Sequence, residues 1–314
     1  MPGPSRLLTA LAAALGAAAV LASATGCSGS ADAASAAPTP AATPTVADSI
    51  DLHLPVADYL LTPQAQLKLD RAAQKLVDQC MHRYGLALAD EPVAARSGPT
   101  TLTQMRYGAT SAQQAKTTGY HFGPANPGYL ATPSASPAPE NTDPGYKLVL
   151  QGNGTPGKND GTPAPYGSRT VQPGGCMGEM TKQLAGRATF LGDAALVHEI
   201  DAKSFTESQQ TPAVKEAFRA WSACMQAKGF HYGTPMDAVN DPAFAGESPG
   251  RDEQRTAEAD VACKQQGNVV GIWFAAEVDR QHALMAEHKD ELRTIGIQMQ
   301  EQAAQVDDTL NTAG

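Results

Sequence analysis

The strongest constraint on the fold is a helix-ending pattern, Cys-Met-x-x-x-Gly, that occurs twice, at residues 80–85 and 224–229. A Thr-Pro pair precedes each copy, at residues 62–63 and 211–212. Threonine is favoured as a helix N-cap, proline in the first turn and glycine at the left-handed C-terminal cap. Apolar residues recur between these signals in steps of three and four, so we predict two amphipathic helices. Their apolar faces comprise Leu69, Ala72, Ala73, Leu76, Val77, Cys80, Met81 and Tyr84 in the first and Val214, Ala217, Phe218, Trp221, Cys224 and Met225 in the second.

A second cysteine in a further helical pattern follows each copy, Cys176 after the first and Cys263 after the second. We interpret the arrangement as an internal duplication; a chance likeness between two amphipathic helices is the alternative. Four cysteines allow three pairings, and the sequence alone does not choose between them. The duplication favours Cys80 with Cys176 and Cys224 with Cys263. A zinc site is disfavoured because no pair has C-x-x-C spacing. The candidate units are 60–190 and 208–314.

The first 26 residues have the three parts of an export signal. Arg6 is the only charged residue before Asp32, an apolar run follows from Leu7 to Ala22, and small residues lead to Cys27. This end resembles the lipobox of bacterial lipoproteins, although Ala24 stands where that pattern prefers leucine. The resemblance implies that a diacylglyceryl group is attached to Cys27 after residues 1–26 are removed. An ordinary secreted protein with a chance cysteine is the alternative.

The number of cysteines fits this interpretation. The chain has five, and an odd number would leave one thiol over in an exported protein. If Cys27 carries lipid, the other four form an even set, which outside the cytoplasm is typical of disulfides. Residues 27–48 are rich in Ser, Ala, Pro and Thr, so we predict a flexible linker between the lipid and a folded domain at 49–314. We expect location on the outer face of the cell membrane, held there by the lipid.

Composition points to an all-α fold with long irregular loops. Aromatic residues make up only 5% of the chain, which also contains 29 glycines and 23 prolines. Much of the glycine and proline lies in residues 86–172, which we predict to be mostly irregular. The net charge is -9, without a basic cluster, which is unfavourable for binding nucleic acid.

A long C-terminal helix is predicted from Val269 to Leu310, with Gly267-Asn268 as a candidate interruption. Its apolar stripe is close to a heptad pattern. The stripe either packs on the domain's own core or, in its distal half, docks a partner helix. The stripe contains Leu284, His288, Leu292, Ile295, Met299, Gln302 and Val306.

No catalytic, metal-binding or cofactor-binding pattern stands out. Residues 246–250 match the G-x-S-x-G nucleophile elbow, but Pro249 follows the serine and has no N–H to donate to an oxyanion. We interpret Ser248-Pro249 as a helix start instead. The seven histidines do not form a known metal motif. Four polar aromatic residues are candidates either to line a ligand cleft or to cap the core, namely His82, Tyr84, Tyr120 and His121.

Four short motifs carry a resemblance to a group of uncharacterised lipoproteins of actinobacteria, over about residues 50–290. They are Arg106-Tyr107-Gly108, Gly119-Tyr120-His121, Pro173-Gly174-Gly175-Cys176 and Trp221-x-x-Cys224-Met225. The resemblance implies an exported protein with paired cysteines and implies no substrate. We therefore expect a non-catalytic binding or scaffold partner of an envelope or transport complex. A cell-wall-acting extracytoplasmic enzyme is the first alternative and a solute-binding lipoprotein the second.

Overall fold

The computed structural model describes residues 40–88, 93, 99–121, 143, 145–155, 160–186, 194–246 and 248–312. Residues 40–314 form one compact unit, distinct from residues 1–39. The predicted signal peptide, Cys27 and the first part of the predicted linker lie outside the described residues. Within the described part of the chain, no helix combines the length and the apolar character needed to cross a membrane.

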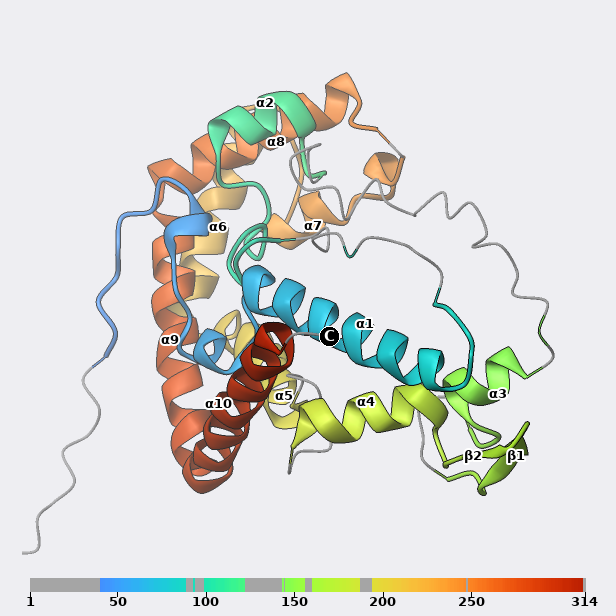
Figure 1. Ribbon diagram of the computed structural model, residues 1–314. Coiled ribbons are helices and arrows are strands. Elements are labelled where there is room, and N and C mark those ends of the chain that lie inside the picture. Colours follow the sequence, from blue (N-terminus) through green and yellow to red (C-terminus); the bar gives the residue numbers. More distant parts are fainter. Residues whose placement is uncertain are drawn as a thin grey trace, which may run out of the picture. The chain divides into compact units, whose positions relative to one another are not determined.

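The described residues form an all-α fold, as predicted (Figure 1). The one sheet among them is a small antiparallel hairpin in which Ala164 pairs with Val171 and Tyr166 with Arg169. The α-helices are α1 Pro63–Arg83, α2 Ala112–Thr118, α3 Tyr146–Gln151, α4 Gly175–Ala185, α5 Ala195–Ser208, α6 Pro212–Ala227, α7 Pro235–Val239, α8 Arg251–Gln266, α9 Val269–Glu287 and α10 Lys289–Asn311. The strands are β1 Ala164–Tyr166 and β2 Arg169–Val171, and the 3-10 helices are η1 Ser49–Asp51, η2 Pro55–Tyr59 and η4 Pro242–Phe244.

The two predicted amphipathic helices, α1 and α6, begin and end in the same way. Thr62 and Thr211 each accept a hydrogen bond from a backbone N–H in the first turn, as N-caps. At the other end Gly85 and Gly229 have φ values of 75° and 89°. The residue after each glycine donates its N–H to the carbonyl of the buried methionine of the motif, at 3.1 Å and 3.0 Å. The same two carbonyls also accept the N–H groups of Tyr84 and Lys228, at 2.9 Å and 3.0 Å, so both helices end in the same hydrogen-bonded turn.

Both disulfides connect the cysteines that the duplication paired. Cys80 is bonded to Cys176 and Cys224 to Cys263, with Cα–Cα distances of 5.6 Å and 5.7 Å. The repeat does not extend to the partner helices, however. Cys176 is the second residue of α4, whereas Cys263 lies in the last turn of α8.

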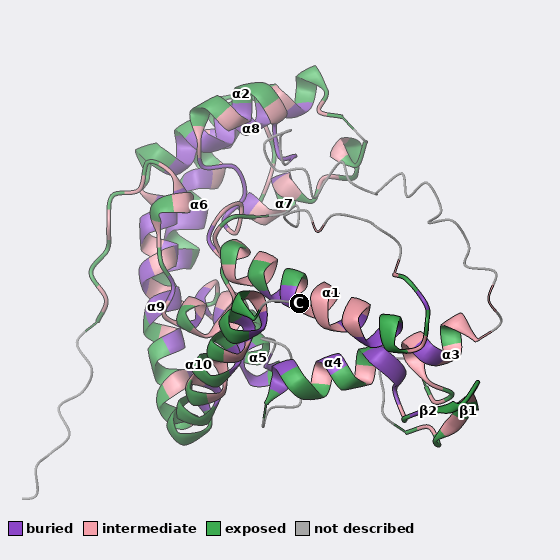
Figure 2. Ribbon diagram, in the orientation of Figure 1, coloured by how far each residue is buried: buried purple, intermediate pink, exposed green. Residues whose placement is uncertain are grey.

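Three clusters of buried residues form the core of the described part of the chain. Figure 2 marks the buried positions along the ribbon. The α6–α9 cluster includes Trp221, Met225 and Trp273, and the α1–α4 cluster includes Met81, Cys176 and Leu184. A third, the α5–α10 cluster, includes Val56, Ile200 and Leu292.

The chain interleaves its two disulfide-bonded parts. Helix α2 comes between the cysteines of the first disulfide in sequence but packs against α8, which carries Cys263 (Figure 1). Helix α10, at the C-terminal end, packs against α1 and α4. Each disulfide-bonded part is therefore packed against a helix that lies in the other part of the sequence.

The C-terminal region is helical, but the helix expected from 269 to 310 is interrupted at His288. Helix α9 ends there and α10 begins, and the chain reverses direction between them (Figure 1). Gly267-Asn268 also interrupts the helical pattern, with Asn268 in the left-handed region at φ 45°. The predicted stripe packs on the domain's own core, since Leu284, Leu292 and Ile295 are buried in the α5–α10 cluster.

The linker expected to be flexible as far as residue 48 is attached to the domain from residue 41 onward. Asp279 on α9 accepts a hydrogen bond from the N–H of Ala41 at 2.7 Å, and Asn268 donates to the carbonyl of Pro44 at 2.9 Å. A Cβ at Gly271 would collide with that same carbonyl. We name residues 40–48 the strap. Its composition predicted flexibility because it lacks large apolar residues, but its backbone pairs with polar side chains of α9 and of the N-cap residue of α9.

Candidate functional site

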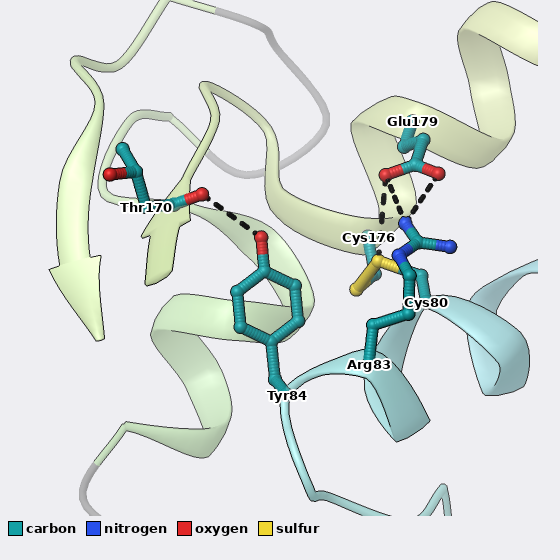
Figure 3. The surroundings of a disulfide bond; sticks show 6 residues. All are labelled: Cys80, Arg83, Tyr84, Thr170, Cys176 and Glu179. Atoms are coloured by element: carbon teal, nitrogen blue, oxygen red, sulfur yellow. Dashed lines mark hydrogen bonds and ion pairs between the residues drawn. A yellow bond between two sulfur atoms is a disulfide. The ribbon is translucent and has the colours of Figure 1, made fainter. Parts of the chain in front are cut away.

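The four predicted cleft residues do not come together in one cleft. The imidazole of His82 is exposed and lies 3.4 Å from the Asp78 carboxylate. The Tyr84 hydroxyl donates to the carbonyl of Thr170 at 3.0 Å, beside the first disulfide (Figure 3). Tyr84 packs on the α1–α4 cluster, whereas Tyr120 belongs to the α6–α9 cluster.

Tyr120 and His121 are buried beside two carboxylates of α8. Glu253 lies 2.7 Å from Nδ1 of His121, and the carbonyl of Gly246 lies 2.8 Å from Nε2. A backbone carbonyl can only accept, so Nε2 carries a hydrogen. Glu253 also accepts the backbone N–H of Tyr120 at 2.8 Å, so one carboxylate of α8 holds both residues in place.

The same segment, residues 105–121, is held by a larger set of buried charges that sequence reasoning did not identify. The Arg106 guanidinium donates to Oε1 of Glu277, and the Tyr107 hydroxyl donates to Oε2 at 2.8 Å. Asp201 on α5 lies 2.9 Å from the same guanidinium. Glu277 is fully buried at 0% exposure. Its two oxygens thus connect α9 to the loop before α2.

A second buried ion pair holds the backbone of that loop. The Lys264 ammonium lies 2.7 Å from Oδ2 of Asp260, one turn away on α8. It also donates to the carbonyls of Tyr107 at 2.6 Å and Ala109 at 3.0 Å. These three acceptors match the three N–H donors of an ammonium group. Oδ1 of Asp260 accepts from the indole N–H of Trp221 at 2.9 Å.

Glycine is required where the loop passes Lys264. Gly108 has a φ of 74°, and a Cβ there would lie 2.6 Å from Val239 and 3.0 Å from the Lys264 ammonium. The residue three positions before it, Met105, has a φ of 65°, which is unusual for a side chain of its size. We name the loop 105–109, with its partners Asp260, Lys264 and Glu277, the buried clamp.

Burial sets the electrostatics of the clamp. It raises the pKa of Glu277, and the hydrogen bonds and charge of Arg106 oppose that rise. It likewise raises the pKa of Asp260 and lowers that of Lys264, while the attraction between the two opposes both shifts. Burial, followed by the nearby Asp260, raises the pKa of Tyr120. The clamp carboxylates face donors of the same chain, so the arrangement fixes the position of the loop.

The spacing of residues along α9 contained a signal for the clamp that the sequence analysis did not use. Trp273, Glu277, Gln281 and Leu284 recur in steps of four, four and three along α9, and all four are buried. Asp260 and Lys264 are four apart on a helix with many polar residues, which is usual for an exposed ion pair. Only their partners elsewhere in the chain distinguish these positions from exposed ones.

The described residues contain neither the predicted helix start at Ser248 nor a metal site. Ser248 does not begin a helix as predicted, because α8 starts at Arg251 with Gly250 as its N-cap. Across the residues that the structure describes, no three His, Cys, Asp or Glu side chains are placed to hold a metal ion. A shallow surface hollow is lined by residues 153–155 and 160–162. Its Asp160 and Asn153 side chains accept backbone N–H groups of Thr155 and Thr162, and so stabilise the loop itself.

Comparisons with protein-family models, with curated proteins and with solved structures gave no match to this chain.

Proposed function

We propose that this protein is a lipid-anchored, extracytoplasmic protein of the bacterial cell envelope that acts by binding a partner protein and not by catalysis. The pairing of all four internal cysteines is the observation that carries the proposal. Stable disulfides are typical of compartments outside the cytoplasm. Their formation leaves Cys27 as the one cysteine outside a disulfide, which fits its assignment to the lipid.

The position of the strap supports a short tether. Residues 28–40 separate Cys27 from the first attached residue, Ala41, so thirteen residues remain between lipid and domain. Thirteen residues span at most about 47 Å at roughly 3.6 Å per residue. The domain would therefore work close to the membrane surface.

The buried clamp supports binding over catalysis. Its carboxylates and ammonium group are among the least exposed charges of the described residues, and each is paired with a group of the same chain. The proposed partner contact on the C-terminal helix is confined to the exposed face of α10, because the apolar stripe is covered by α1, α4 and η2. Ile297 lies on that exposed face and is 50% exposed.

Lipid attachment is tested by expressing the full chain in a Gram-positive host with lipoprotein processing. We expect the wild type to enter the membrane fraction, to require detergent for release and to carry the mass of a diacylglyceryl group on its N-terminal peptide. Cys27→Ser should instead be released without detergent. Recovery of the wild type from the medium, with an unmodified Cys27 thiol, would contradict the anchor.

Partner binding is tested separately with a photo-crosslinking amino acid in intact cells. At position 297 we expect a discrete crosslinked product of constant mass, and at position 216 none. Glu216 is a suitable control because its side chain is 70% exposed and lies on a different helix, α6. Equal crosslinking at both positions, or none at 297, would contradict this surface. Release of muropeptides from peptidoglycan by the purified domain would contradict the non-catalytic assignment.

A further inference from the structure

The two disulfides differ in how far they are open to solvent. Cys80 and Cys176 are 2% and 1% exposed, and Cys263 is 2% exposed. Cys224 is the exception among the four, because it is only partly buried, in the last turn of α6. The second disulfide therefore joins a partly exposed residue to one in the core.

The surroundings of the two bonds reinforce this difference. Over the first disulfide, Arg83 forms a 2.6 Å ion pair with Glu179, whose Oε2 lies 3.7 Å from the Cys80 sulfur (Figure 3). The two side chains of this ion pair lie beside the Cys80 sulfur and restrict the approach of a thiolate to it. The Cys224 sulfur instead lies 3.7 Å from the neutral amide oxygen of Gln266, in an exposed setting. Its helix neighbours Ala223 and Ala227 are small and exposed.

We propose that Cys224 is a site of thiol–disulfide exchange with an extracytoplasmic dithiol reductant, so that Cys224–Cys263 can be opened while Cys80–Cys176 stays closed. A thiolate of the reductant attacks the Cys224 sulfur, the bond to Cys263 breaks, and Cys263 leaves as a thiolate that takes up a proton. The second thiol of the reductant then attacks the mixed disulfide and releases Cys224 as a thiol. The reductant ends as a disulfide, so two electrons have passed to the protein.

Reduction of this disulfide should affect the buried clamp, because Cys263 is next to a clamp residue in the sequence. Cys263 is the neighbour of Lys264, whose ammonium holds the carbonyls of Tyr107 and Ala109. The bond ties the last turn of α8 to the last turn of α6. Reduction breaks this covalent link at the C-terminal end of α8, where Lys264 lies. We therefore expect faster amide hydrogen exchange in residues 105–109 of the reduced form.

The experiment uses the exported chain carrying Cys27→Ser, so that no other thiol competes. It is treated under native conditions with dithiothreitol in one arm and with thioredoxin in the other. Free thiols are blocked at intervals with one alkylating reagent and, after denaturation and full reduction, the rest with a heavier one. We expect Cys224 and Cys263 to acquire the first label at least about tenfold faster than Cys80 and Cys176. A thioredoxin that lacks its resolving cysteine should be trapped on Cys224.

Each outcome bears on the proposal. Opening in both arms supports exchange with a protein or a small dithiol, and opening by dithiothreitol alone assigns the site to small dithiols. Equal rates at the two disulfides, earlier opening of Cys80–Cys176 or trapping on Cys263 would overturn it. The variant Cys224→Ser/Cys263→Ser is the control, in which Cys80–Cys176 should open as slowly as before. The test is independent of the lipid anchor, since it uses a chain that cannot be lipidated at position 27.

Discussion

The Lys264 ammonium lies 2.7 Å from the Asp260 carboxylate, and the two side chains are 2% and 0% exposed. A buried pair of this kind contributes little net stability by itself, because desolvation offsets the attraction. Removal of one partner is costly, since the other charge is then left unpaired in the core. Through Lys264 the pair also fixes the loop that contains Tyr107, more than 150 residues earlier in the chain.

We predict that Lys264→Met lowers the free energy of unfolding by about 3–5 kcal/mol, because it leaves Asp260 buried without its cation. The double variant Lys264→Met/Asp260→Asn should be more stable than this single variant, since asparagine still accepts from Trp221 and carries no charge. Urea unfolding followed by circular dichroism measures both. Arg255→Met is the matched control, because Arg255 and its partner Asp252 are 70% and 83% exposed. A double variant less stable than the single one would show that the stranded charge is not the cause.

Gly271 is predicted to hold the strap in place through its lack of a side chain. Alanine is normally favoured over glycine inside a helix by about 1 kcal/mol. At position 271, however, a Cβ collides with the carbonyl of Pro44. We expect Gly271→Ala to detach residues 40–48 and to speed their cleavage in limited proteolysis. Gly296→Ala in α10 is the control, because its Cβ would meet Tyr59 at an ordinary 3.7 Å. Equal cleavage of the two variants would refute this role.

Local signals made α1 and α6 predictable. Their N-caps, proline starts and glycine ends lie within the helices or next to them, so a short window of sequence contains the information. The disulfide pairing was also predictable, but only because the Cys-Met-x-x-x-Gly motif occurs twice. The break at His288 was not, since neither proline nor glycine marks it.

The clamp and the strap could not be predicted, because their partners are distant in sequence. Arg106 and Glu277 are 171 residues apart, and Ala41 and Asp279 are 238 apart. A charged residue of α9 has the same local pattern whether it faces water or a guanidinium. The sequence left open whether the four polar aromatic residues line a ligand cleft or cap the core. It also did not show that Tyr84 and Tyr120 pack in different clusters, because both follow comparable helical segments.

The pH dependence of stability should contain a contribution from Tyr232. Burial and a 2.6 Å hydrogen bond to Asp241 raise the pKa of Tyr232 to about 12, from 10.0. The folded state thus binds this proton more tightly than the unfolded state. The contribution is fully present below pH 10 and is lost as the pH rises toward 12. Burial also raises the pKa of Tyr107 and of Tyr120, so the phenolate absorbance of the wild type is compared with that of Tyr232→Phe. The difference should show one titration near pH 12. Identical titrations of the two proteins near that pH would contradict the prediction.

The two disulfides should stabilise the domain by different amounts. In the chain-entropy relation, closing loops with sequence separations of 96 and 39 contributes about 4.7 and about 3.9 kcal/mol. We therefore expect Cys80→Ser/Cys176→Ser to lose about 0.8 kcal/mol more than Cys224→Ser/Cys263→Ser in urea unfolding. The gap should widen further, because the first pair of substitutions leaves two hydroxyls in an almost fully buried site, whereas the hydroxyl introduced by Cys224→Ser would be partly hydrated. The opposite order would mean that the second disulfide stabilises the folded state itself, through the end of α8 that carries the clamp lysine.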